Sequence, residues 1–184
     1  SETVSGNTAS VPLAASGAEP VVATEVKTAA AAPRIKIESG HVEGTISLLG
    51  GRFDELKLKQ YRQTLDADSD IVSLLKPTSA ENAYYALYGW APGGGLAPDL
   101  VPGPNTIWTL ESGEILTPST PVVLAWENGQ GLTFRREISL DENYMFAIQQ
   151  SAQNNSTNTV SLAPYGTIAR HGEPADLKNF FILH

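Results

Sequence analysis

Short runs in which apolar and polar residues alternate recur along this chain from residue 34 onwards, and they limit what it can fold into. Ile35 and Ile37 alternate with charged residues, and Leu56 and Leu58 alternate with lysines. Because successive side chains of a strand point to opposite faces of a sheet, this period of two predicts half-buried β-strands. No long run has the 3.6-residue period of an amphipathic helix. We therefore expect an all-β protein built from antiparallel hairpins.

Turn-forming residues separate these runs. Gly50-Gly51 lies between the runs around Ile46 and Leu56 and is typical of a tight hairpin, since glycine adopts the positive φ angles that such turns require. Further turns are predicted at residues 127–131, 141–143 and 154–158. The segment 91–104 holds four prolines and four glycines, so it is expected to be a long irregular connection.

One strand of the series has an irregular pattern. Leu132, Phe134, Ile138 and Leu140 share one parity, which places them on one face of a strand. Arg136 has the same parity and interrupts the apolar face with a charged residue.

Composition excludes several classes of function. The 184 residues are 41% hydrophobic, which suffices for one globular domain with a sizeable core. The formal net charge is −8, so a phosphate backbone would be repelled and we expect no nucleic-acid partner. The absence of cysteine excludes disulfides, thiolate metal sites and cysteine nucleophiles, and it fits either a reducing or an oxidising compartment. No window approaches the run of about 18 apolar residues that a membrane-spanning helix needs.

The chain divides into two parts by composition. Residues 1–33 are rich in Ala, Ser, Thr, Val, Glu and Pro and contain no aromatic residue, so we expect a disordered, low-complexity linker there. Residues 34–184 are expected to form the folded part. The chain begins with Ser1 rather than methionine and stops at His184, directly after the apolar run 180–183. We therefore expect both ends to be cut from a longer protein.

One acidic triplet has the spacing of a calcium loop. Asp66, Asp68 and Asp70 match the first three ligand positions of an EF-hand. Ile71 stands where the loop requires glycine, and Pro77 stands where it requires the bidentate glutamate. We interpret the triplet as a solvated acidic turn between strands.

No catalytic motif is evident. The Gly93-Gly94-Gly95 run is followed by prolines that cannot begin the helix a phosphate cradle needs, so it is expected to be a flexible loop. The three histidines, His41, His171 and His184, are dispersed, and only His171 has carboxylates nearby in sequence. We therefore expect no catalytic, cofactor-binding or metal-binding residues in this chain, and no cofactor. A carboxylate pair assembled by the fold stays open, because sequence does not determine such geometry.

A cluster of aromatic residues leaves two interpretations open. Tyr84, Tyr85, Tyr88 and Trp90 could line a peptide or sugar cleft, because aromatic faces offer large contact areas with a polar handle. In a small all-β domain such residues more often fill the core or cover its edge.

Five segments, in order, carry a resemblance to a known family. Residues 50–64 (GGRFDELKLKQYRQT) resemble the signature hairpin in the large periplasmic domain of the YidC family, the bacterial membrane protein insertases of the Oxa1/YidC/Alb3 superfamily. The resemblance continues through YYALYGW at 84–90, NTIW at 105–108, FRREI at 134–138 and FFILH at 180–184. It covers the chain from about Arg34 to its last residue.

The resemblance implies a fold and a location. Family members carry a first transmembrane helix, a variable linker, a periplasmic antiparallel β-supersandwich similar to galactose mutarotase, and then the membrane-embedded insertion bundle. This chain would correspond to the linker (1–33) and the N-terminal part of the supersandwich (34–184), incomplete here. It would lie in the periplasm, tethered to the inner membrane by helices outside this chain.

The resemblance also implies a function without catalysis. The domain would belong to an insertase and chaperone that aids insertion and folding of inner-membrane proteins, with or without the Sec translocon. Its implied partners are the Sec translocon, SecDF and nascent membrane proteins. Two alternatives stay open: a carbohydrate-binding or mutarotase-like β-sandwich module, and a spacer that positions the membrane-embedded part.

Overall fold

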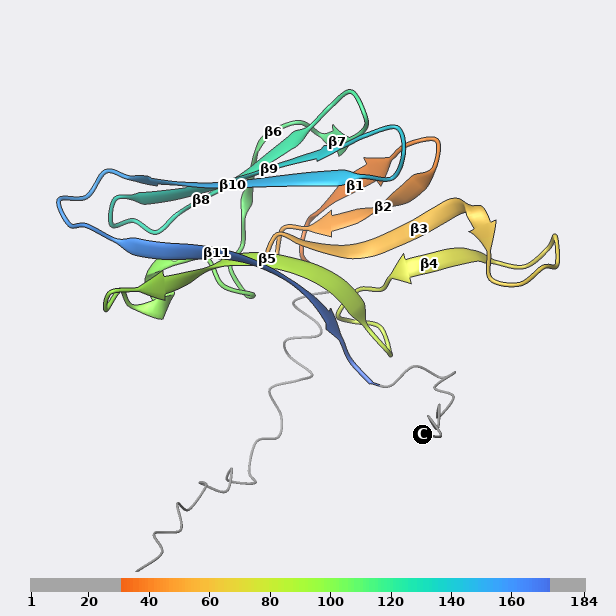
Figure 1. Cartoon of the computed structure of the whole chain (residues 1–184), viewed down its shortest axis with the longest axis horizontal. Helices are drawn as coiled ribbons and strands as arrows, with labels where there is room; N and C mark the ends of the chain where they lie inside the picture. Colours follow the sequence, from red (N-terminus) through yellow and green to blue (C-terminus); the bar gives the residue numbers. More distant parts are fainter. Residues whose placement is uncertain (1–30, 173–184) are drawn as a thin grey trace, which may run out of the picture.

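The computed structural model describes residues 31–172, and these form eleven strands and one 3-10 helix. The predicted all-β fold is confirmed (Figure 1). No helix in this part of the chain is long and apolar enough to cross a membrane. The elements are β1 (Arg34–Glu38), β2 (Val42–Ser47), β3 (Arg52–Arg62), β4 (Ile71–Leu75), β5 (Tyr84–Gly93), η1 (Pro98–Leu100), β6 (Thr109–Ser112), β7 (Ile115–Leu116), β8 (Val122–Glu127), β9 (Leu132–Leu140), β10 (Phe146–Asn154) and β11 (Ser161–Arg170).

Two sheets form the layers of a sandwich (Figure 1). The larger sheet has the order β11-β5-β3-β2-β1-β7, with β4 paired to β3 beside this path. The smaller sheet has the order β10-β9-β8-β6. All pairings are antiparallel apart from the short parallel contact of β1 with β7. The predicted antiparallel hairpins are thus present.

The core lies between the two sheets and follows the alternating pattern. Strand β9 alternates buried and less buried residues along its whole length. Arg136 is itself fully buried on the same face as Phe134 and Ile138. The charged residue that interrupts this apolar run is therefore accommodated inside the sandwich, because the opposite layer supplies partners for its guanidinium. The other fully buried apolar side chains include Ile37, Val42, Ile46, Trp108, Leu116, Val122 and Leu124.

The Gly50-Gly51 pair turns the chain between β2 and β3 as predicted, with φ angles of 75° and 57°. The turn is longer than a tight hairpin, since the last strand pair is Ser47 with Arg52. The backbone of this loop binds a distant segment, because Gly50 N donates to Thr106 O at 2.7 Å and Trp108 N donates to Leu48 O at 2.9 Å. The Gly-Gly loop is therefore part of the sandwich rather than a free tip.

A bulge in β3 sets which of its residues reach the core. Ile46 pairs with Phe53 and Thr45 pairs with Glu55, so Asp54 is the extra residue on β3. Phe53 and Leu56 consequently both face the core despite their odd spacing. Leu56 is buried and Leu58 packs against the same core, which confirms the prediction that they share a face.

Strand β5 extends further than the sequence pattern predicts. Residues 91–93 pair with β11 and belong to the strand, so the irregular connection begins only at Gly94. His171 N donates to Ala83 O, so these two residues form a hydrogen-bonded pair of the β5–β11 ladder. Hydrogen-bonded and non-hydrogen-bonded pairs alternate along an antiparallel ladder, so the odd-numbered residues of both strands bond to each other. By that alternation Pro92 and Pro164 both lie at positions whose backbone nitrogen points away from the partner strand. Proline is tolerated at such positions because no ladder hydrogen bond is lost.

Residues 1–30 of the expected linker lie outside the described residues, as do the apolar run 180–183 and His184.

Candidate functional site

Arg136 lies at the centre of the sandwich and joins the two sheets. It comes from β9 in the smaller sheet and is 0% exposed. Its Nη1 donates to the carbonyl oxygen of Gly51 at 2.6 Å, and its Nη2 donates to that of Tyr88 at 2.7 Å. A longer bond of 3.3 Å joins Nη2 to Oε1 of Gln150. The guanidinium thus satisfies carbonyl groups of the opposite sheet that would otherwise be buried without a donor.

Aromatic rings cover the rest of this guanidinium. Its carbon lies 4.6 Å from the ring of Trp108 and 5.8 Å from that of Tyr88, within the range of cation–π attraction. Nε has no hydrogen-bond partner among residues 31–172. Burial lowers the pKa of Arg136 to about 10, which still leaves it protonated at neutral pH. We interpret Arg136 as a buried cation that fixes the spacing of the sheets.

Gly51 has no room for a side chain beside this cation. A Cβ built there would lie 2.6 Å from Nη1 of Arg136 and 3.2 Å from the Trp108 ring. The glycine is therefore required by close approach as well as by its positive φ.

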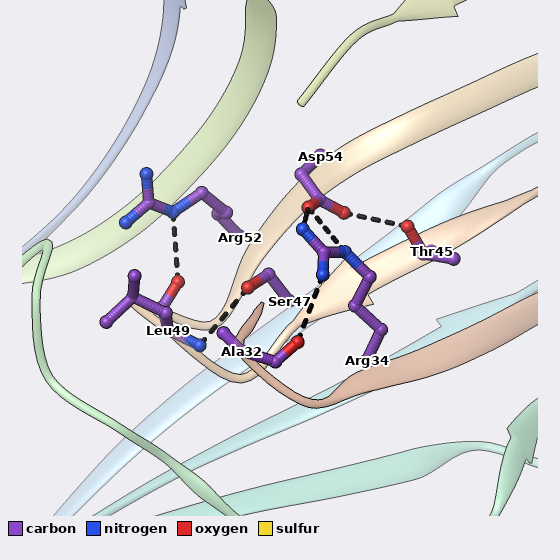
Figure 2. Close-up of polar contacts among 7 residues, drawn as sticks. All are labelled: Ala32, Arg34, Thr45, Ser47, Leu49, Arg52 and Asp54. Carbon is purple, nitrogen blue, oxygen red and sulfur yellow. Dashed lines mark hydrogen bonds and ion pairs between the residues drawn. The ribbon is translucent and has the colours of Figure 1, made fainter. Parts of the chain in front are cut away.

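Asp54 forms a second buried polar cluster, shown in Figure 2. Its side chain is 2% exposed, and Oδ2 accepts from both Nε and Nη2 of Arg34 at 3.0 Å. Thr45 Oγ1 donates to Oδ1 at 2.8 Å. Arg34 also donates through Nη1 to the carbonyl oxygen of Ala32 at 3.0 Å. The carboxylate on the β3 bulge thereby secures the entry of the chain into β1.

Arg52 secures the loop next to this cluster (Figure 2). Its Nε donates to the carbonyl oxygen of Leu49 at 2.9 Å, and its Nη2 donates to that of Pro104. The guanidinium also lies 5.4 Å from the ring centre of Tyr85. Burial lowers the pKa of Arg52. These contacts bind both the Gly-Gly loop and the connection before β6, so Arg52 holds these two segments together.

The aromatic cluster of β5 is divided between the two faces of the larger sheet. Tyr84, Tyr88 and Trp90 pack against the core, and the Trp90 ring centre lies 5.8 Å from that of Phe134. Tyr85 points to the other face by strand alternation and contacts His171, with ring centres 5.6 Å apart. The core interpretation therefore holds for three of the four aromatic residues.

Two surface cavities lie away from this aromatic cluster. One cavity of about 240 Å³ lies over β1, β2 and β3 and is lined by lysine and glutamate side chains. Among these, Lys57 and Glu55 form an ion pair at 3.0 Å. The other, of about 80 Å³, has an apolar floor that includes Leu96 and Leu132 and a polar rim. Neither brings a nucleophile to a general base, so neither suggests a reaction.

The singled-out acidic and histidine residues do not converge. Asp66, Asp68 and Asp70 lie in the exposed loop between β3 and β4. His41 stacks on Tyr144 with ring centres 4.8 Å apart, whereas His171 lies beside Tyr85. Within residues 31–172 no three His, Asp or Glu side chains are grouped to hold a metal ion. The expectation that the chain has no catalytic, cofactor-binding or metal-binding residues stays a prediction.

Sequence reasoning missed Arg136 and Asp54 as key polar residues. A signal for Arg136 was present, because a charged residue at an inward-facing position must find buried partners. Asp54 gave no comparable signal, since its burial depends on the bulge.

Comparisons with known proteins place the chain in a family. The family model described as the YidC periplasmic domain matches residues 34–184. The chain is 64% identical over 143 residues to the membrane protein insertase YidC of Ruegeria sp. (strain TM1040), covering 78% of this chain and 24% of that protein. It is 54% identical over 181 residues to that of Roseobacter denitrificans, covering 96% of this chain and 30% of that protein.

A third relative, the membrane protein insertase YidC of Ruegeria pomeroyi, is 51% identical over 192 residues, covering 99% of this chain and 32% of that protein. The chain thus spans between about a quarter and a third of the length of these relatives. Because the family model matches most of the chain and includes every described strand, the chain belongs to the YidC periplasmic domain family.

Proposed function

We propose that this chain is a non-catalytic periplasmic domain of a membrane protein insertase, and that it aids insertion and folding of inner-membrane proteins with or without the Sec translocon. The family match over residues 34–184 carries this proposal. The names of the relatives, membrane protein insertases at 51% to 64% identity, support it.

The polar chemistry of the described residues supports a role without catalysis. Both carboxylate oxygens of Asp54 accept hydrogen bonds from neighbouring side chains. Four of the hydrogen bonds of Arg52 and Arg136 go to backbone carbonyl oxygens of the fold, those of Leu49, Pro104, Gly51 and Tyr88. Groups engaged in this way hold loops and sheets in place and are not available to move protons on a substrate.

The proposal extends to organisation and partners. Residues 1–33 act as a linker, and residues 34–184 form the N-terminal part of a β-supersandwich. The domain lies in the periplasm and is tethered to the bacterial inner membrane by helices outside this chain. Its partners are nascent membrane proteins, the Sec translocon and SecDF.

The carbohydrate-binding or mutarotase-like alternative has less support. It needs exposed aromatic faces and an acid–base pair in one cleft. Tyr84, Tyr88 and Trp90 instead pack against the core.

Site-specific photo-crosslinking tests the proposal. A photoreactive residue is placed at exposed Gln149 or Asp68 in the complete protein, within cells that synthesise an arrested inner-membrane protein. We expect crosslinks to that nascent chain and fewer to an arrested soluble protein. Equal crosslinking to both, or none at any exposed position, would contradict the proposal. A sugar mutarotation assay on the same protein should show no rate above the uncatalysed reaction.

A further inference from the structure

Asn128-Gly129 lies in the turn between β8 and β9 and is the one asparagine–glycine pair of the sequence. An asparagine that precedes glycine is especially prone to lose its side-chain amide, because glycine has no side chain to hinder attack by its own backbone nitrogen. Gly129 is exposed, and a Cβ built on it would have nothing within 4 Å. The turn therefore leaves the reacting pair uncrowded.

Three side-chain hydrogen bonds make Asn128 the centre of this turn. Its Oδ1 accepts from Gln130 N at 2.8 Å and from Leu132 N at 3.1 Å. Its Nδ2 donates to the carbonyl oxygen of Leu100 at 3.1 Å. Leu100 is the last residue of η1, so the bond from Nδ2 ties the β8–β9 turn to the connection between β5 and β6.

The two donors on Oδ1 favour attack at the amide carbon of Asn128. When the backbone nitrogen of Gly129 adds to this carbon, negative charge develops on Oδ1. Backbone N–H groups already directed at that oxygen stabilise the charge without reorganising, as the donors of an oxyanion hole do. A cavity of about 80 Å³, lined in part by Asn128 and Gln130, adjoins the turn and is large enough to admit water for a later hydrolysis.

We propose that Asn128 is a site of spontaneous deamidation, and that this modification frees the η1 connection from the β8–β9 turn. The backbone nitrogen of Gly129 loses its proton to solvent and forms a bond to Cγ of Asn128. The bond between Cγ and Nδ2 breaks, and Nδ2 takes up a proton and leaves as ammonia. Water then adds to one carbonyl carbon of the cyclic imide, and the C–N bond at that carbon breaks. One water is consumed, one ammonia is released, and residue 128 becomes aspartate or isoaspartate.

The modification alters one of the three bonds selectively. Aspartate keeps the acceptors for Gln130 N and Leu132 N, but it has no hydrogen to donate to Leu100 O. It instead places a negative charge against that carbonyl oxygen. Isoaspartate adds one atom to the backbone of the turn and disturbs it further. The reaction uses only atoms of residues 128 and 129 together with water, so it depends neither on the proposed function nor on segments outside the described chain.

Peptide mapping by mass spectrometry, after incubation of the full chain in mildly alkaline buffer, provides the first test. We expect aspartate and isoaspartate to accumulate at residue 128, and to do so faster as pH rises, because the attacking nitrogen must lose its proton. Asn155 is exposed and precedes Ser156, so it is an internal control that should react several-fold more slowly. Gly129→Ala should slow the reaction at Asn128 in the same way, although alanine strains the backbone at φ 71°.

Amide hydrogen exchange on two variants tests the structural consequence. Asn128→Asp reproduces the aspartate product. Exchange should become several-fold faster at Leu100 N, which donates to Ala97 O within η1, whereas the amides of Gln130 and Leu132 should stay protected. Asn128→Ala removes both the acceptor and the donor, so all three amides should exchange faster. The difference between the two variants separates release of η1 from general loosening of the turn.

Three outcomes would overturn the inference. Absence of product at residue 128 in the folded chain, with product formed in urea, would show that the fold blocks the attack. Equal rates at Asn128 and Asn155 would show that neither Gly129 nor the two donors on Oδ1 matter. Unchanged exchange at Leu100 in Asn128→Asp would contradict the release of η1. None of these results bears on the crosslinking test, so the proposed function stands or fails separately.

Discussion

The guanidinium of Arg136 on β9 donates a 2.6 Å hydrogen bond to the carbonyl oxygen of Gly51, in the loop that joins β2 and β3 of the opposite sheet. This bond links a buried cation to the backbone of a loop that has no room for a side chain. Together with the bond to Tyr88 O, it determines how the two sheets face each other.

Replacement of Arg136 should strongly destabilise the fold. In Arg136→Met the buried carbonyl groups of Gly51 and Tyr88 lose their donor, and each unsatisfied group costs about 1–3 kcal/mol. Relief from burying a charge offsets part of this, so we expect a net loss of about 2 kcal/mol in the free energy of unfolding. Urea denaturation measures the loss. The control, Arg135→Met, removes an exposed ion pair from the same strand and should change stability far less. Similar losses in both variants would contradict the structural role of Arg136.

Alanine at Gly51 should be more harmful than alanine at another glycine with positive φ. Gly51→Ala adds backbone strain of about 1–2 kcal/mol and also forces a methyl group against the Arg136 guanidinium. Gly129→Ala adds comparable strain at φ 71° but has nothing within 4 Å of the new Cβ. The difference between the two variants in urea denaturation therefore isolates the contact. Equal losses would show that Arg136 can move away freely.

Neutralising Asp54 should weaken the link between β3 and the entry to β1. Asp54→Asn keeps an acceptor for Thr45 but removes the charge that pairs with Arg34. Because this carboxylate is buried and its partner is partly exposed, we expect a loss of about 2 kcal/mol, below the range for a fully buried pair. Faster amide exchange at Arg34 and Thr45 should accompany it. A stable variant with unchanged exchange would contradict the role assigned to Asp54.

The exposed pair of Glu111 and Arg135 should make a contribution that depends on pH. The hydrogen bond from Arg135 lowers the pKa of Glu111 in the folded state. The unfolded state then binds more protons in acid, so the contribution is present above pH 4.5 and is lost as pH falls through the folded pKa. The parent chain should be more stable than Glu111→Gln at pH 7, and this difference should vanish at pH 3. It should also shrink in 1 M salt. A difference that grows in acid would contradict this assignment.

The sequence alone determined the class of fold, most strands and the family. The alternation in segments such as 34–38 and 132–140 arises because one face of each strand is more buried than the other. This pattern is visible in the segment itself and does not depend on which strand lies beside it. The shared face of Leu56 and Leu58 could be predicted for the same reason. The five ordered segments sufficed for the resemblance that the family match confirms.

Only the tertiary structure decided which polar residues are buried. Arg136 is buried because the carbonyl groups of Gly51 and Tyr88, 85 and 48 residues away, converge on it. Asp54 is buried because a bulge makes it the extra residue of β3, which no alternation pattern reveals. Residues 91–93 joined a strand because β11 presents a complementary ladder at which Pro92 loses no bond. In each case the deciding partners are remote in sequence, so periodicity, which reports only which side of an element is apolar, could not identify them.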